Sequence, residues 1–227
     1  MMQKNMFDSL LLTELSDEST DEVVQLITAD EEGEIDLSSI PEDIPILPIR
    51  NTVLYPGVVI PITVGRSKSI KLVKKAYKGD RIIGVAAQKN EKSEDPNYNE
   101  IYQVGTVARI IKMLVLPDGN TTIIIHGLSR FEIKAVLEEE PYLRASIELL
   151  TENFPDKEDK ESQAVIDSLK DAANRVMELN PEIPQEARIA IDNIESPGFL
   201  THFLSSNINA EVKDKQRLLE EHDGMTR

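Results

Sequence analysis

The chain has 227 residues, of which 40% are hydrophobic and 29% are charged, and this composition is typical of a soluble globular protein. It contains no cysteine, which excludes disulfides, thiolate nucleophiles and cysteine-ligated zinc, and its 4% of aromatic residues leave few rings to stack on nucleobases. The formal net charge of −16 is uneven, with −12 in residues 1–43, +4 in 44–150 and −8 in 151–227, so three parts with different roles are expected.

Residues 1–43 are predicted to form an acidic, flexible tail. They hold 13 acidic residues against one lysine, Lys4, and too few large apolar residues for a packed core. Two short apolar clusters, at 6–15 and 23–27, could form amphipathic helices on a suitable surface. The Leu10–Leu12 run is too short for the hydrophobic part of a signal peptide. Because neither an export signal nor a membrane span is evident, we expect a cytoplasmic protein.

Residues 44–150 are predicted to be rich in β-strands. Seven segments are enriched in Val, Ile and Thr, namely IPILPIR, VVIPITV, RIIGVAAQ, YQVGTVARIIKMLVL, TTIIIHG, RFEIKAVL and YLRASIELL. Between the fourth and fifth lies a Pro-Asp-Gly-Asn turn in which Gly119 can adopt positive φ, and this pattern predicts a hairpin. Pro61 lies inside a strand-like segment, which indicates an edge strand or a bulge.

One helix is expected among these strands. Ser67 is a plausible N-cap, Ile70, Val73 and Tyr77 follow at helical spacing, and Gly79 stands where a helix would end. Its basic residues could contact phosphate, but the polar face of an amphipathic helix is the favoured interpretation because aromatic residues are not interleaved. These residues are Arg66, Lys68, Lys71, Lys74, Lys75, Lys78 and Arg81. Strands with a single helix indicate an α+β fold built on a small, twisted β-barrel.

Residues 151–160 are predicted to be a charged linker, after which the apolar period changes from two to about 3.6. Residues 161–227 are therefore expected to form an α-helical bundle. One apolar stripe runs from Ala164 to Met177, a second helix begins at Pro184, and Ser196-Pro197 is a typical N-cap and first turn of a third. A fourth helix is expected from about Asn209 to Gly224.

No catalytic, cofactor-binding or metal-binding residues are predicted. The sequence lacks a phosphate-binding loop of the G-x-x-x-x-G-K-[ST] type, a G-x-G-x-x-G motif and a G-x-S-x-G nucleophile motif. His126, His202 and His222 are far apart in the sequence, and none has a second ligand at metal-binding spacing. For His202, on the third helix, a partly buried polar contact is expected.

Five segments, in order, resemble the N-terminal domain of Lon-type ATP-dependent proteases. Residues 46–57, ILPIRNTVLYPG, resemble the opening of that domain, and residues 58–66, VVIPITVGR, resemble the segment that follows it. Residues 103–110 (QVGTVARI), 116–119 (LPDG) and 127–131 (GLSRF) continue the resemblance, which covers about residues 44–224. The resemblance implies a PUA-like β-domain followed by a helical bundle that leads toward an ATPase domain.

The resemblance also implies a division of labour. In Lon proteins this region precedes an ATPase ring and a serine protease domain with a Ser-Lys dyad, and motifs of neither are present here. The implied role is to recognise unfolded or damaged proteins and present them to a homohexameric enzyme that degrades misfolded and short-lived regulatory proteins. ATP and Mg²⁺ would then belong to the ATPase domain, and no cofactor is expected in residues 1–227.

A β-domain can bind unfolded chains through an edge strand and an apolar groove. The candidate substrate contacts are Tyr55, Pro56, Val58, Val59, Met113, Leu114 and Leu116. The alternative is that these residues are core, because apolar residues in strands are usually buried. The apolar clusters of the tail resemble such unfolded segments, so the tail could also occupy the site and inhibit it.

Two other classes of function stay open. A stand-alone adaptor would use the same domain to recruit clients to another machine. An RNA-binding β-module is a further alternative, although the acidic ends and the scarcity of aromatic residues argue against nucleic acid as a partner.

Overall fold

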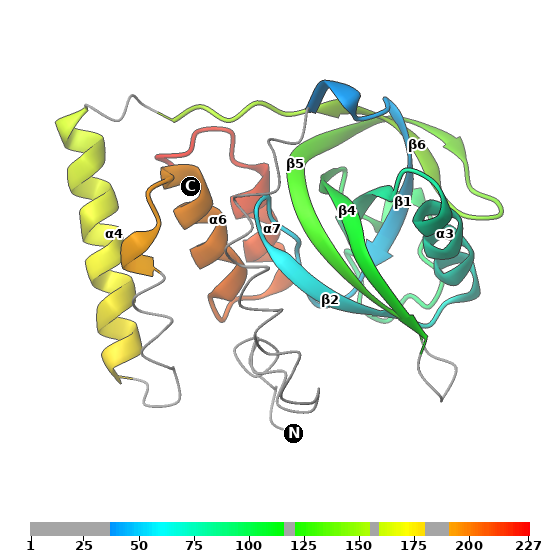
Figure 1. Ribbon diagram of the computed structural model, residues 1–227, viewed down its shortest axis with the longest axis horizontal. Coiled ribbons are helices and arrows are strands. Elements are labelled where there is room, and N and C mark those ends of the chain that lie inside the picture. Colours follow the sequence, from blue (N-terminus) through cyan, green and yellow to red (C-terminus); the bar gives the residue numbers. More distant parts are fainter. Residues whose placement is uncertain (1–36, 116–120, 155–158, 180–190) are drawn as a thin grey trace.

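The computed structural model describes residues 37–115, 121–154, 159–179 and 191–227. Six strands form one sheet in the order β2-β5-β4-β3-β1-β6. An additional pairing of β5 with β6 joins five of these strands into a closed ring, which is the curled sheet at the right of Figure 1. The strands are β1 (Asp43–Ile49), β2 (Val59–Val64), β3 (Ile82–Ala87), β4 (Val104–Val115), β5 (Thr121–Glu138) and β6 (Arg144–Leu149).

The longest strand, β5, corrects the prediction of seven strands. The segments TTIIIHG and RFEIKAVL are one continuous strand of 18 residues, because the chain passes Gly127 without turning. The first part of β5 pairs with β2 and the last part with β6, while β4 runs along its other side. Register shifts in these ladders mark bulges, which help a sheet to bend into a barrel. The predicted hairpin is confirmed by the pairing of Val115 with Thr121, and its turn lies outside the described residues.

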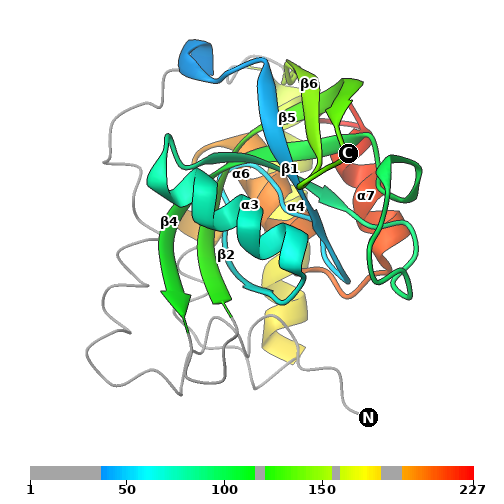
Figure 2. The same cartoon turned by 90° about the vertical axis from the view of Figure 1, so that its right-hand side faces the viewer.

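The predicted helix is confirmed as α3 (Ser67–Lys78), which lies against the barrel (Figure 2). Leu72 and Val73 are buried in the barrel core, while the lysines of α3 face outward. The N-cap is Arg66 and not Ser67, and no side chain caps this end; Gly79 is the C-cap, as expected. Of the predicted tail, the part that the structure describes contains a short 3-10 turn, Leu37–Ser39, and the start of β1.

In the described residues after the barrel, the named helices are α4 (Lys160–Leu179), α6 (Pro197–Asn207) and α7 (Val212–Glu220). The predicted cap of α6 is confirmed, since the Ser196 hydroxyl accepts a hydrogen bond from the Phe199 amide at 3.3 Å. Leu219 of α7 joins the core cluster of the barrel, whereas Met177 of α4 and Leu200 of α6 belong to a separate small cluster.

The apolar stripe predicted on α4 is only partly buried. Met177 is enclosed, but Val165, Leu169 and Val176 stay exposed. In Figure 1, α4 is the helix farthest from the barrel, with α6 and α7 between them. The helix predicted from Pro184 lies mostly outside the described residues. Across the part of the chain that the structure describes, no helix has the length and apolar character needed to cross a bilayer.

Candidate functional site

Strand β2 lies outside the closed ring and extends the sheet beside the first part of β5. In the described residues β1 pairs with β6 through residues 43–45 and β2 pairs with β5, so the second half of β1 and the outer edge of β2 are not joined by strand pairing. A groove of about 380 Å³ lies there. This feature, called the β1–β2 groove below, is lined by Leu47, Pro48, Ile49, Arg50, Pro61, Ile62, Thr63, Val64, Gly65, Arg66 and Ser69.

Among the described residues, no strand pairs with the outer backbone edge of β2, which borders this groove. The Gly127 amide donates to the Val58 carbonyl at 2.9 Å, which places the amides of Ile60 and Ile62 toward β5. The backbone groups of alternate residues, Pro61 and Thr63 among them, therefore point outward. Proline fits this position because it has no N–H to leave unpaired, and the prediction of an edge strand at Pro61 is confirmed.

Two arginines give this end of the barrel a positive charge. Arg66 donates from Nη1 to the Pro48 carbonyl at 3.2 Å, so it bridges the two sides of the groove. Arg50 donates from Nη2 to the Ser93 carbonyl at 2.8 Å, and both guanidinium groups bond to the side-chain oxygen of the buried Gln88. Burial lowers the pKa of Arg66, the charge of Arg50 lowers it further, and Asp95 opposes the shift. Among the described residues, the hydrogen-bond acceptors of both arginines are neutral, so neither guanidinium is bonded to a carboxylate there.

An apolar surface adjoins the groove on the outer face of the sheet. Pro61 pairs with Ile124, and Thr63 pairs with Thr122, which in turn pairs with Leu114. Residues directly opposite in neighbouring strands point to the same face. Pro61 is exposed and Ile124 and Leu114 are half-buried, so this face offers both apolar area and a strand edge to a partner.

The predicted contact residues do not all lie on one surface. Val59 and Leu114 share the outer face just described and are half-buried. Met113 points to the opposite face and packs partly against the core. Pro56 is half-buried in the turn before β2, and Leu116 lies outside the described residues.

For Tyr55 and Val58 the expectation of a surface contact is wrong. Both side chains are buried, which agrees with the alternative prediction that they belong to the core. The Tyr55 hydroxyl donates to the Lys215 carbonyl of α7 at 2.6 Å, and its ring lies 5.7 Å from that of His202. The apolar turn therefore faces the helical region, because folding places that region over it.

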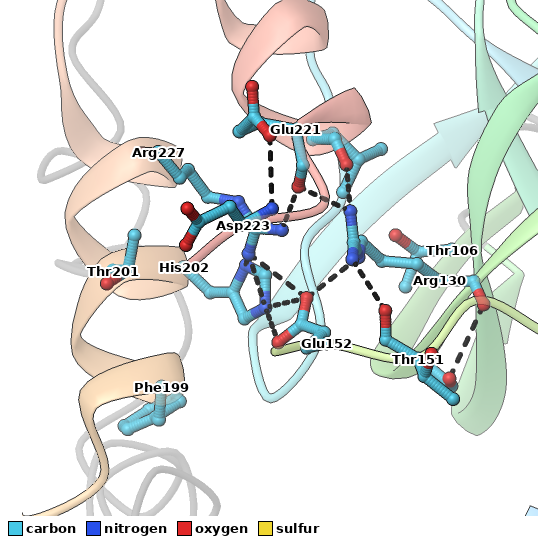
Figure 3. Close-up of polar contacts among 12 residues, drawn as sticks. Thr106, Arg130, Thr151, Glu152, Phe199, Thr201, His202, Glu221, Asp223 and Arg227 are labelled. Carbon is cyan, nitrogen blue, oxygen red and sulfur yellow. Dashed lines mark hydrogen bonds and ion pairs between the residues drawn. The ribbon is translucent and has the colours of Figure 1, made fainter. Parts of the chain in front are cut away.

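A buried polar cluster joins the barrel to the helical region, and sequence reasoning did not find it. It is called the barrel–helix junction below and consists of Arg130, Glu152, His202 and Arg227 (Figure 3). Arg130, on β5, is 1% exposed, and its Nη1 donates to the carbonyls of Leu219 at 2.8 Å and Glu221 at 2.7 Å. The only signal was the motif at residues 127–131, which carried the family resemblance but no role for its arginine.

Glu152 is the centre of this cluster. Its carboxylate lies 2.7 Å from Nε of Arg130, 2.8 Å from Nε2 of His202 and 3.0 Å from Nη1 of Arg227. Burial raises the pKa of Glu152, but the hydrogen bond from His202 and the charges of Arg227 and Arg130 outweigh it and lower the pKa to about 2. Burial lowers the pKa of His202, although the hydrogen bond to Glu152 and its charge oppose this shift.

The junction is arranged to hold two parts together. Its histidine and carboxylate lie between two arginines, and carbonyls of α7 and of the following segment accept further hydrogen bonds from these arginines. The prediction that His202 makes a buried polar contact is confirmed. Over the described ranges of the chain, no group of three or more His, Asp or Glu is placed to hold a metal ion.

Comparison with known proteins identifies similar chains. The profile of the "ATP-dependent protease La (LON) substrate-binding domain" matches residues 43–227. A Lon protease of Cytophaga hutchinsonii is 58% identical over 91% of this chain and 25% of its own length. A Lon protease of Flavobacterium johnsoniae is 50% identical over 93% of this chain and 26% of its own length. The chain thus spans about a quarter of these relatives.

Solved structures share the fold. The N-terminal domain of a Mycobacterium avium complex Lon protease aligns with a TM-score of 0.64 at 19% identity, covering 81% of this chain and 92% of that one. A Lon N-terminal domain protein from Xanthomonas campestris aligns with a TM-score of 0.57 at 17% identity, covering 80% of this chain and 92% of that one. At these identities the likeness concerns the fold alone.

Proposed function

This chain belongs to the Lon substrate-binding-domain family, and from that premise we propose that it binds non-native polypeptide at the β1–β2 groove and breaks no bond itself. The observation that carries the proposal is the free edge of β2, which borders both the groove and an exposed apolar face. Unfolded chains expose unpaired backbone groups and apolar side chains together, and this arrangement meets both.

Recognition at such an edge has low sequence specificity. The outward carbonyls of β2 and the Thr63 amide can pair with the backbone of an extended segment, whatever its side chains. Pro61 removes one donor from the edge, so the pairing is short and the affinity weak. Arg50 and Arg66 add a preference for segments with a carboxylate near the bound strand.

Weak single-site binding suits a domain that is present in several copies. The proposed parent protein is a cytoplasmic homohexamer in which ATP and Mg²⁺ act in an ATPase domain and a serine protease domain cleaves the client. Six grooves on one ring would raise the overall affinity by avidity, without a new contact in any of them. A stand-alone adaptor would use the groove in the same way.

The proposal is tested with a charge placed in the groove. Thr63→Glu puts a carboxylate on the exposed outer face of β2 and keeps the outward amide, and the matched control Leu137→Glu makes the same charge change at an exposed position far along β5. Binding of a labelled, permanently unfolded protein is followed by fluorescence anisotropy. We expect Thr63→Glu to weaken binding about fivefold, roughly 1 kcal/mol, and Leu137→Glu to leave it unchanged. Equal affinities for both variants would contradict the groove as the site.

A further inference from the structure

The end of the β1–β2 groove at α3 holds donor groups that the edge of β2 does not need for strand pairing. Arg66, the N-cap of α3, spans the groove there by its bond to the Pro48 carbonyl at 3.2 Å. The guanidinium of Arg50 meets that of Arg66 on the side-chain oxygen of Gln88. A chain that lies along β2 in the direction of α3 therefore arrives at two cationic groups, one of which crosses its path.

The first turn of α3 lacks the acidic or capping side chain that usually stands at a helix start. It contains no acidic residue, and its N-cap residue makes no side-chain capping bond. The first amides of a helix have no acceptor within the helix, and the helix dipole adds a partial positive charge there. The N-terminal end of α3 therefore favours an anion, as Arg66 does.

A helix start alone does not identify a ligand site, and Ser69 supplies an independent indication. This residue is 6% exposed and lines the groove, and its hydroxyl has no hydrogen-bond partner among the described residues. A buried hydroxyl without a partner loses the hydrogen bonds that water gives it in the unfolded chain. Ser168 of α4, in contrast, bonds back to the Ala164 carbonyl at 2.7 Å. The Ser69 hydroxyl is therefore available to a group bound in the groove.

The acidic side chain that acts on this end of the groove is already paired. Asp95 is close enough for its charge to raise the pKa of Arg66, but its carboxylate bonds to Lys68 at 2.9 Å. Lys68 also bonds to Glu140, at 2.8 Å. Lys68 thus offsets the nearby negative charge, and the capacity of Arg50 and Arg66 to bind a carboxylate is not used within the described residues.

We propose that this end of the groove binds the C-terminal carboxylate of a non-native polypeptide, with Arg66, the Ser69 hydroxyl and the first amides of α3 as donors. The inference rests on the proposed function, because the residues before that carboxylate would pair with the edge of β2. It also sets the direction of the bound chain. A client parallel to β2 brings its C-terminus to α3, whereas an antiparallel client would bring its N-terminal ammonium to the arginines, where like charges repel.

Three versions of one short, uncharged, apolar peptide test this assignment with the full chain. The first ends in a free carboxylate, the second ends in an amide, and the third has the amide end and one internal aspartate. Fluorescence anisotropy of a label at the peptide N-terminus gives the affinities. We expect the free acid to bind about tenfold more tightly than the amide, because the amide loses the charge-assisted hydrogen bonds. The third peptide should bind like the second; if it binds like the first, carboxylate side chains suffice and the terminal assignment is overturned.

Two substitutions then locate the carboxylate on the protein. Ser69→Ala removes only the hydroxyl and should reduce the preference for the free acid from about tenfold to about threefold. Arg66→Gln keeps a side chain that can bond to the Pro48 carbonyl but removes the charge, and it should abolish the preference. The control Ser168→Ala makes the same small change on the exposed face of α4 and should keep the full preference. A ratio of acid to amide affinity that neither Ser69→Ala nor Arg66→Gln alters would overturn the proposal.

The edge variant Thr63→Glu separates failure of this inference from failure of the proposed function. If the free acid and the amide bind equally and Thr63→Glu weakens both, the groove binds polypeptide and only the preference for a C-terminus is refuted. If no version of the peptide binds, the inference and the proposed function fail together.

Discussion

The barrel and the helical region of this protein are held by different forces. The barrel has continuous strand ladders around two clusters of buried aliphatic and aromatic side chains. The described helices have a core of only three buried residues, and α4 leaves several large apolar side chains in solvent. The barrel–helix junction and the bond from Tyr55 to α7 add buried polar contacts between the helices and the barrel, beside the apolar packing of Leu219.

This difference predicts which part of the molecule loses most stability when a single side chain is changed. Apolar packing in the barrel is spread over many contacts, so the loss of one side chain removes a fraction of it. A buried ion cluster depends on every member, because each unpaired charge left inside the protein costs several kcal/mol. The attachment of the helical region should therefore fail before the barrel does.

The largest loss of stability is expected when the charge of Arg130 is removed from the barrel–helix junction. Arg130→Met keeps a long side chain but removes one cationic partner of the buried Glu152 carboxylate and the donor to the Leu219 carbonyl, so we expect a loss of about 3–4 kcal/mol. Urea unfolding measures it. Arg144→Met on β6 is the control, because Arg144 is half-buried and its closest approach to Glu138 is 3.9 Å; its expected cost is below about 1 kcal/mol. Similar costs for the two variants would refute the importance of the junction.

Acidification should destabilise the barrel–helix junction because it protonates Glu152. Its pKa in the folded chain is about 2 against an ordinary 4.5, so the unfolded chain takes up the proton first. The stabilisation is present above pH 4.5 and is lost as the pH falls from about 4.5 towards 2, by about 3 kcal/mol. The lowered pKa of His202 acts in the same direction, starting below its ordinary value of 6.5.

Unfolding free energies at pH 7, 5 and 3.5 check this expectation. Glu152→Gln should be less stable than the parent chain at pH 7 and should lose less on acidification. Glu148→Gln, which changes an exposed carboxylate of β6, should follow the parent curve. If the unfolding free energy of Glu152→Gln depends on pH in the same way as that of the parent chain, Glu152 is not the source of the acid sensitivity.

The smallest expected effects come from adding one methyl group at either of two glycines, one in contact with α6 and one at the groove. Gly57 has φ +76°, and an added Cβ would lie 2.6 Å from the ring of Phe199 on α6, whereas Gly65 at the groove has nothing within 4 Å. We expect Gly57→Ala to cost about 2 kcal/mol through backbone strain and displacement of α6. Gly65→Ala should change stability by less than about 1 kcal/mol. Thermal unfolding of both variants measures the difference, and equal effects would show that the turn at Gly57 does not support α6.

Local patterns in the sequence predicted many elements of this fold correctly. The hairpin of β4 and β5, helix α3, the Ser196 cap and the edge position of Pro61 all follow from the properties of a few adjacent residues. The division of β5 into two strands was wrong because Gly127 interrupts the pattern of side chains without turning the backbone. Its lack of a side chain instead admits the Tyr55 carbonyl, which would lie 2.2 Å from an added Cβ.

The candidate site was only partly predictable. Val59 and Leu114 were singled out for their apolar character near turns, and the structure brings them to one face. Tyr55 has the same character, and nothing near it in the sequence indicates that α7, 160 residues away, covers it. Arg50 and Arg66 were not recognised as part of a site, because their convergence on Gln88 depends on the closure of the barrel.

The sequence by itself determined that this protein has a β-rich part with one amphipathic helix, a helical part, and a family relationship carried by short motifs. Hydrophobic periodicity, helix-cap residues and turn residues depend on a few neighbouring positions, so they can be recognised in the sequence. Only the tertiary structure decided which strand edge stays open, which apolar turn is covered, and that Arg130 and Glu152 meet in the interior. Pairing of charges and closure of a sheet depend on distances in space between residues far apart in the chain, and no local pattern contains those distances.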